Sequence, residues 1–158
     1  MARLAPVLLA VCLVGCAADP ARDVLKRETQ VLEPAMLPRI LRQAPVAADE
    51  DLRAEPLLES EEFSAYLLQF RTGEPRHIHR EHDLTFIVHR GQGEIYINDQ
   101  RRVCRPGDVF HIPRGTPHYC VNTGSEPLVV VNFFTPPFDG KDRIPLPRGS
   151  HSYERVPP

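Results

Sequence analysis

Residues 107–122 read Gly107-Asp-Val-Phe-His-Ile-Pro113-Arg-Gly115-Thr-Pro-His118-Tyr-Cys-Val-Asn122. Two short runs in this stretch, 109–112 and 118–121, combine β-branched, aromatic and other apolar side chains, as strands do. A Gly-Asp turn signal precedes the first run, and a Pro-Arg-Gly sequence separates it from the second. Because proline and glycine restrict where a chain turns, the stretch predicts two short strands joined by a tight turn.

The same alternation of short apolar runs and turn signals continues on both sides of this stretch. The further runs are residues 57–58, 63–70, 84–88, 94–97 and 128–134. Turn signals separate most of them at intervals of roughly 8–12 residues, a pattern typical of an all-β sandwich or barrel. We therefore predict one β-barrel over residues 51–140, which suits a chain of 158 residues with 42% hydrophobic and 25% charged side chains.

Three histidines stand where they can meet on the inner face of such a barrel. His77 and His79 are two residues apart, so in a strand both side chains point to the same face. His118 begins a strand whose direction is fixed by the turn before it. Two imidazoles on one face, with a third from another strand, offer the nitrogen ligands that transition metals bind.

Residues 73–134 resemble a cupin domain, and the second cupin motif is the strongest part of the resemblance. That motif, G-x5-P-x-G-x2-H-x3-N, is matched at every fixed position. The matching residues are Gly107, Pro113, Gly115, His118 and Asn122. The resemblance implies the cupin double-stranded β-helix, a jelly-roll barrel, with a divalent metal held by His77, His79 and His118.

The first cupin motif, G-x5-H-x-H-x3,4-E-x6-G, is matched less completely. Its histidines are His77 and His79 and its closing glycine is Gly91, but Gly73 lies two residues too close to be its opening glycine. Six residues separate Gly91 from the family's glutamate ligand, and that position is Leu84 here. Leucine cannot bind a metal, so the identity of a fourth ligand is left open.

Two neighbours of Leu84 are alternatives for that ligand. Asp83 brings an anionic oxygen, but its strand parity is opposite to that of Leu84. His82 shares the parity of Leu84 but lies in the expected hairpin turn. The alternatives are three histidines alone, four histidines, or three histidines with Asp83. Three imidazoles suit Fe, Zn, Ni or Cu, and the loss of the glutamate makes Mn less suitable.

A cupin fold does not by itself specify a reaction. One hypothesis is a metalloenzyme for a small molecule, a dioxygenase, isomerase or lyase, with Phe86, Val88 and Cys120 lining the pocket. The metal would act as a Lewis acid or as an oxygen-binding centre. The alternative is a module that captures a small ligand or a metal without turnover, which Leu84 favours because it makes the pocket more apolar. A structural role in the cell envelope ranks third.

The N-terminal residues 1–15 have the pattern of an export signal. Arg3 precedes an apolar run that ends at Gly15, too short for a bilayer span of about 20 residues but suited to a secretory signal. The sequence Leu13-Val-Gly-Cys16 resembles the lipobox of bacterial lipoproteins, which implies that Cys16 is acylated. We therefore expect a periplasmic or outer-membrane lipoprotein of the cell envelope; an ordinary signal peptide is the alternative.

The four cysteines need not form two disulfides. Cys12 leaves with the export signal and Cys16 takes the lipid, so Cys104 and Cys120 remain. In the jelly-roll order that the resemblance implies, their strands flank the strand at 94–97, about 9.5 Å apart. That separation exceeds the limit of about 7 Å for a disulfide, although sheet curvature can shorten it. The alternative is a pair of buried thiols.

The segments outside the predicted barrel are shorter in total than the barrel but hold nine of the 17 prolines. Residues 16–50 read as an irregular tether with one short helix within 21–30, and residues 141–158 as a proline-rich strap or tail. The net charge of −2, without a basic run, excludes an electrostatic footprint for nucleic acid. The expected partners are a small-molecule ligand, the membrane through the lipid anchor and, by resemblance to small cupins, a second copy in a homodimer.

Overall fold

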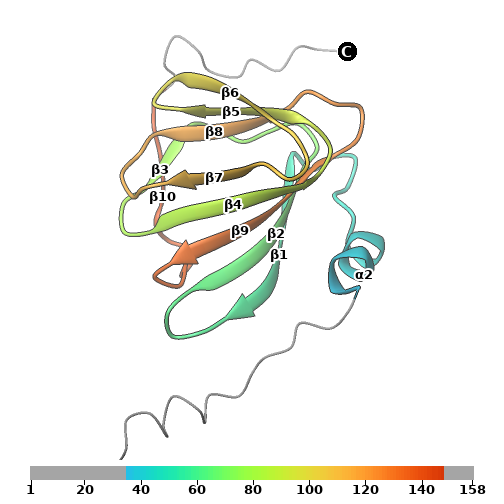
Figure 1. Cartoon of the computed structure of the whole chain (residues 1–158), viewed down its shortest axis with the longest axis horizontal. Coiled ribbons are helices and arrows are strands. Elements are labelled where there is room, and N and C mark those ends of the chain that lie inside the picture. The colour runs from blue at the N-terminus through green and yellow to red at the C-terminus, as the bar shows by residue number, and fades with distance from the viewer. Residues whose placement is uncertain (1–34, 148–158) are drawn as a thin grey trace, which may run out of the picture. The chain divides into compact units, whose positions relative to one another are not determined.

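The computed structural model describes residues 35–147, which form two antiparallel β-sheets that pack face to face (Figure 1). These residues belong to a compact unit that begins at Ala35. The predicted fold class, an all-β cupin double-stranded β-helix, is therefore confirmed. Between residues 35 and 147, no helix is both long enough and apolar enough to cross a membrane.

Each sheet has five strands, and neither sheet follows the order of the chain. The first sheet contains, in spatial order, β1 (Leu52–Glu59), β2 (Ser64–Phe70), β9 (Leu128–Thr135), β4 (Asp83–Arg90) and β7 (Val109–Ile112). The second contains β10 (Arg143–Pro145), β3 (His77–His79), β8 (His118–Asn122), β5 (Gly93–Ile97) and β6 (Gln100–Cys104). Because the chain passes repeatedly from one sheet to the other, the two layers form one wound barrel (Figure 1).

The hydrophobic core lies between the two sheets because inward and outward side chains alternate along each strand. In β4, Leu84, Phe86 and Val88 are buried, whereas Ile87 between them is 38% exposed. Phe86 stacks on Phe110 of β7 with ring centroids 4.9 Å apart. Each such buried side chain stabilises the fold by about 1.5–3 kcal/mol relative to exposure.

Two strands lie outside both the apolar runs and the histidine pair from which strands were predicted. β6 has the polar sequence Gln-Arg-Arg-Val-Cys and forms the edge of its sheet, where an alternating apolar pattern is not required. β10 lies within the segment 141–158 and pairs with β3, so that Arg143 lies opposite His79. This part of the predicted strap is therefore integrated into the sheet that carries the histidines.

A short helix, α2 (Met36–Gln43), precedes the barrel. Pro38 is compatible with it because it stands in the first turn, where no intrahelical N–H bond is required. The chain after α2 is tied to β2, where Gln69 Nε2 donates to the Ala44 carbonyl at 2.8 Å. The helix predicted within residues 21–30 lies outside the described residues.

The two cysteines of the barrel, Cys104 and Cys120, are both buried and both free thiols. Their strands flank β5 as the jelly-roll order predicts, since Cys104 pairs with Gly93 and Cys120 with Ile95. Burial raises the pKa of Cys104 to about 12 and that of Cys120 well above its usual range. Both side chains are therefore neutral thiols at neutral pH, which is the second of the two alternatives considered.

Candidate metal centre

The strand β3 places two of the three predicted histidines inside the barrel. His77 and His79 are 2% and 5% exposed, whereas Ile78 between them faces the other way. His118, 2% exposed, pairs directly with His77 across the β3–β8 ladder. The turn before β8 is fastened to β3 as well, because the Gly115 N–H donates to the His79 carbonyl at 2.6 Å. Backbone pairing thus brings the three imidazoles together.

The orientation of the three imidazole rings leaves nitrogen atoms available to a ligand. His77 Nδ1 donates to the Pro75 carbonyl and His118 Nδ1 to the Thr116 carbonyl, each at 2.9 Å. A carbonyl can only accept, so both rings carry their proton on Nδ1 and present an unprotonated Nε2. This backbone support is typical of histidines that bind metals.

Two ring nitrogens of the cluster have no hydrogen-bond partner among the described residues. They are His79 Nδ1 and His118 Nε2, and both are buried. Buried polar atoms without a partner are rare in native proteins, because each costs the free energy of its lost hydration. Their presence at one point in the barrel indicates that a ligand completes the site.

Burial also keeps the three imidazoles neutral. It lowers the pKa of His77 to about 4, with a further contribution from Arg143. Burial and, to a smaller extent, the neighbouring imidazoles lower the pKa of His79 to about 3 and that of His118 to about 4. Neutral imidazole is the form that binds a metal, so the cluster is ready for one at neutral pH.

The spacing of the cluster fits a single metal ion. One ligand atom from each of the three histidines lies within 4.8 Å of the others. Two ligand atoms that each lie about 2.1 Å from one ion are about 3.4 Å apart at the tetrahedral angle. A shift of the ring nitrogens of about 1 Å or a little more therefore closes the cluster around one ion, and the residues present fit the metal that the cupin resemblance implies.

A carboxylate that the sequence analysis did not identify lies beside the histidines. Glu74 Oε2 is 3.8 Å from His77 Nε2 and 3.3 Å from Arg143 Nη2, and the side chain of Glu74 is only 9% exposed. Burial raises the pKa of Glu74, against the opposing influence of His118 and Arg143. The sequence feature that could have pointed to Glu74 is its neighbour Gly73, which lies two residues from the position that the first motif requires.

Gly73 shows why Glu74 lies there. A side chain at Gly73 would bring its Cβ to 2.6 Å from the Cys120 carbonyl, so only glycine allows this close approach to β8. The Glu74 N–H then donates to the same carbonyl at 3.1 Å. Residues 73 and 74 are thus held against the strand that begins with His118.

A cavity of about 150 Å³ opens from the histidine cluster. Its lining residues are Leu52, Ala54, Tyr66, Leu68, Glu74, His77, His79, Leu84, His118, Asn132, Phe134, Phe138 and Arg143. The Asn132 Oδ1 atom is buried without a hydrogen-bond partner among the described residues. The Phe134 and Phe138 rings lie 5.0 and 5.2 Å from the His79 ring, so one wall of the cavity is aromatic.

The predicted pocket residues Phe86, Val88 and Cys120 do not line this cavity. All three are buried in the hydrophobic core instead. The reason is their position along the strands: β4 meets the cavity at Leu84, and Phe86 and Val88 lie progressively farther from that end. Strand parity correctly predicted that they point inward, but it does not say how deep the cavity extends.

Neither alternative ligand next to Leu84 joins the histidine cluster. His82 Nδ1 lies 2.6 Å from Asp142 Oδ2, and its Nε2 lies 3.1 Å from the Pro137 carbonyl. Asp83 forms an ion pair with Arg114 at 2.9 Å on the outside of the barrel. Both side chains are thus occupied elsewhere, and Leu84 itself forms part of the cavity wall.

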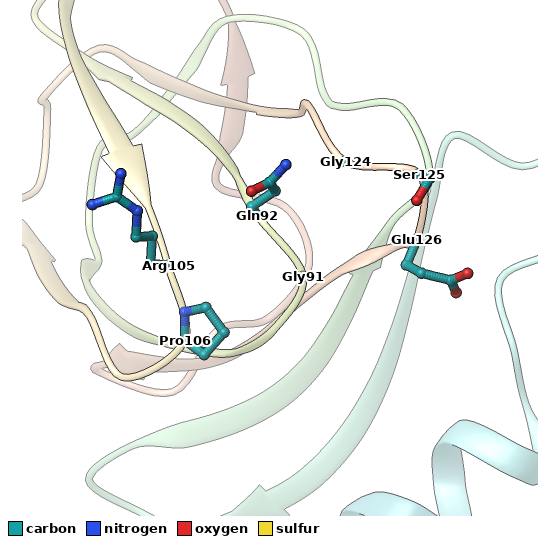
Figure 2. A pocket seen from close by; sticks show the side chains of 7 residues that line it. All are labelled: Gly91, Gln92, Arg105, Pro106, Gly124, Ser125 and Glu126. Carbon is teal, nitrogen blue, oxygen red and sulfur yellow. The ribbon is translucent and has the colours of Figure 1, made fainter.

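A second pocket, of about 360 Å³, lies at the opposite ends of the strands (Figure 2). Three turns form it, and its lining residues are Gly91, Gln92, Arg105, Pro106, Gly124, Ser125 and Glu126. Figure 2 shows Arg105 and Glu126 on different sides of this pocket. None of the buried unpartnered atoms found within residues 35–147 belongs to it, so the histidine cavity is the stronger candidate site.

Comparison with known proteins agrees with the fold. The sequence profile of the family described as cupin domain matches residues 67–134. An uncharacterized protein of Aquifex aeolicus is 39% identical over 95 residues, which span 60% of this chain and 78% of that protein. Residues 67–134 therefore form a cupin domain.

Two further similarities concern an enzyme and a solved structure. Acireductone dioxygenase of Gluconacetobacter diazotrophicus is 36% identical over 63 residues, which are 37% of this chain but only 35% of that enzyme. A conserved protein with a double-stranded β-helix domain from Klebsiella pneumoniae superposes with a TM-score of 0.56 at 18% identity. That superposition covers 69% of this chain and 91% of the other, and it bears on the fold alone.

Proposed function

We propose that this protein binds a divalent transition metal through His77, His79 and His118 and uses it to transform a small molecule inside the barrel. The observation that carries the proposal is the pair of buried ring nitrogens, His79 Nδ1 and His118 Nε2, that lack a hydrogen-bond partner among the described residues. A bound metal ion satisfies both. Fe, Zn, Ni and Cu all suit a site of three imidazoles.

Among the candidate reactions we favour oxygenation over isomerisation and lyase chemistry. The partial match to acireductone dioxygenase supports this choice. A bound metal supplies Lewis acidity and, if it is redox-active, reactivity toward O₂. The chain itself supplies an apolar, aromatic wall that excludes water from the histidines, and Asn132 offers an unpaired amide oxygen that can orient a substrate.

Metal content tests the first part of this proposal. Protein purified without a chelator is expected to carry close to one divalent transition metal per chain by elemental analysis. Less than about a tenth of a metal per chain, both as isolated and after incubation with Fe²⁺, Zn²⁺, Ni²⁺ or Cu²⁺, would contradict it.

The second part of the proposal, oxygenation of a small molecule, is tested with an oxygen electrode. Fe²⁺-loaded protein should consume O₂ with some member of a panel of small enediols and organic acids, and Zn²⁺-loaded protein should not.

The alternative is a cupin that captures a small ligand or metal without turnover. Leu84 favours it, because an apolar side chain occupies the position where the family supplies a catalytic-site carboxylate and lines the cavity instead. Protein that binds metal tightly but gives no product with any compound that it binds would support this second function. The metal-content experiment is common to both functions, and only the turnover experiment separates them.

We further propose that the protein is exported and anchored to the cell envelope through a lipid on Cys16. The support is the apolar run of residues 4–15 followed by cysteine. Acyl chains hold a protein at a membrane surface by their own burial, without a spanning helix. In a bacterial host, Cys16→Ala is expected to move the protein from the membrane fraction to the soluble fraction. Unchanged membrane association would contradict the lipid anchor.

A further inference from the structure

We propose that Glu74 supplies the fourth ligand of this metal site, from the segment before β3, in place of the family glutamate whose position Leu84 occupies. This inference rests on the proposed metal site and adds an anionic ligand to it. Among the described residues that line the cavity, Glu74 is the sole carboxylate. It comes from a part of the chain ten residues before the position where the motif places its glutamate.

The backbone fixes the position of Glu74. Gly73 lies so close to β8 that no side chain fits, and the Glu74 N–H is bonded to the Cys120 carbonyl. Glu74 is therefore anchored to the strand that also presents His118. The carboxylate lies beside His77 and outside the group of ligand atoms within 4.8 Å of one another, so its side chain must rotate toward His79 and His118 to share one ion with all three histidines.

The distance from Glu74 to His77 fits two ligands of one ion. Glu74 Oε2 lies 3.8 Å from His77 Nε2, within the span of about 4.2 Å that two metal–ligand bonds of about 2.1 Å can cover. His77 Nδ1 is already bonded to the Pro75 carbonyl, so Nε2 is the atom that faces Glu74. The carboxylate thus lies beside the ring nitrogen that is free to bind.

The ion pair with Arg143 compensates the buried carboxylate only in part. Burying a charge is costly unless it is paired and hydrogen-bonded. Arg143 Nη2 is 3.3 Å from Glu74 Oε2, longer than the 2.7–2.9 Å of a strong charged pair. The same Nη2 also lies 3.4 Å from the Pro75 carbonyl, and the side chain of Arg143 is 33% exposed. A divalent ion at the histidines provides the remaining compensation.

A fourth ligand of this kind changes which metals the site prefers. Carboxylate oxygen is a harder donor than imidazole and suits Mn²⁺ and Fe²⁺. With Glu74 bound, the absence of a glutamate at Leu84 no longer disfavours Mn²⁺. The metal preference of the site would then depend on a residue at a variable position of the first cupin motif.

Metal titration of four proteins tests this assignment. Mn²⁺, Co²⁺ and Zn²⁺ are titrated into metal-free wild type, Glu74→Gln, Arg143→Gln and the matched control Glu126→Gln, whose side chain is exposed at the second pocket. Glu74→Gln is expected to weaken Mn²⁺ binding by at least about tenfold, to weaken Zn²⁺ binding less, and to change the visible absorption spectrum of bound Co²⁺. Glu126→Gln should behave as wild type.

The Arg143→Gln variant distinguishes two roles of Glu74: a ligand of the metal, or only the ion-pair partner of Arg143. If Glu74 binds the metal, removing its competing cation leaves Mn²⁺ affinity unchanged or raises it. If Glu74 only holds Arg143 in place, both substitutions weaken metal binding equally, and the assignment is wrong. Wild-type affinity and an unchanged Co²⁺ spectrum in Glu74→Gln would also overturn it while leaving the proposed function intact. Absence of metal binding in wild type overturns both.

A stability control keeps the test independent of folding. Thermal unfolding of each metal-free variant is measured beside the titrations. If Glu74→Gln does not fold, Glu74→Asp takes its place, because it retains the charge beside Arg143 but withdraws the carboxylate by one methylene. It is expected to fold and to bind Mn²⁺ more weakly than wild type; wild-type affinity in Glu74→Asp with an unchanged Co²⁺ spectrum would count against Glu74 as a ligand.

Discussion

The same strands form two different environments in the barrel: a cavity end, which contains polar side chains, and a packed end, which contains apolar ones. At one end β8 begins with His118 and β4 presents Leu84 to a cavity; two to four residues farther on, Cys120 and Val88 pack in a closed apolar core. The cavity end holds unpartnered polar atoms, which lower stability, whereas the packed end holds side chains that raise it. This comparison indicates that a site can be altered at the cavity end with little loss of fold.

His118→Ala gives the largest expected effect, at the cavity end. We expect metal content to fall from about one per chain to below about a tenth, because even changes outside the ligand shell cost about 10- to 100-fold in metal affinity. Elemental analysis measures the loss, and circular dichroism checks that the fold is retained. If the metal stays, His118 is not a ligand; if the fold is lost, the division between the two ends does not hold.

Phe86→Ala tests the packed end. The side chain of Phe86 is 2% exposed and stacks on Phe110, so we expect the free energy of unfolding to fall by about 3–5 kcal/mol. Chemical denaturation of the metal-free protein measures this change. The neighbouring Ile87→Ala, on the outward face of β4, should cost less than about 1 kcal/mol. Equal losses at the two positions would contradict the assigned faces of the strand.

Asp142→Asn tests how the chain after β9 is attached near the cavity. Burial raises the pKa of Asp142, but hydrogen bonds from His82 and from the Glu81 and Arg80 N–H groups outweigh it, and the net pKa is lowered. Because the folded pKa is lower than the unfolded one, this stability is present above the unfolded value near 3.9 and is lost as pH falls through the folded value. At pH 7 we expect Asp142→Asn to cost about 1.5–3 kcal/mol.

The pH dependence of the unfolding free energy shows whether Asp142 stabilises the fold through its charge or only through packing. Denaturation curves of wild type and Asp142→Asn should converge as pH falls below about 4. Asp139→Asn, at an exposed neighbouring position, serves as the control and should follow wild type. A difference between wild type and Asp142→Asn that stays constant down to the lowest measurable pH would show that the charge of Asp142 is not what stabilises the fold.

Asp83→Asn gives the smallest expected effect. Hydrogen bonds from the Arg114 side chain and N–H hold the pKa of Asp83 at about 2, but both side chains are partly exposed. Exposed ion pairs contribute about 0.2–1 kcal/mol, so the unfolding free energy should change by no more than that at pH 7 and less at high salt. Metal content should be unaffected. Loss of metal in this variant would return Asp83 to the set of ligands.

The fold and the three histidines could be predicted because local sequence fixes them. Pro113 and Gly115 set the turn before His118, and the two-residue spacing of His77 and His79 puts both on one face of a strand. The turn and His118 both lie within the sixteen consecutive residues of the second motif, 107–122. That His118 meets the other two histidines depends on the long-range pairing of β3 with β8, which the resemblance to cupins supplied.

Glu74 and the cavity wall could not be predicted in the same way. Glu74 reaches the histidines because Gly73 approaches β8, a strand some 45 residues later in the chain, and strand parity contains no information on that approach. Phe86 and Val88 have the correct parity but the wrong depth, because the position of the cavity along the strand depends on how both sheets pack. β6 was missed because an edge strand needs no apolar alternation.

The pairing of Arg143 with His79 makes the order of synthesis matter for this protein. β3 meets β8 through a single residue pair, His77 with His118, and its other edge is covered by β10. During synthesis, residues 77–79 therefore have a strand on both sides only after residues 143–145 have been made. A nascent chain that has emerged only as far as β9 holds all three histidines but not the strand that encloses them, so metal loading is expected to follow completion of the barrel.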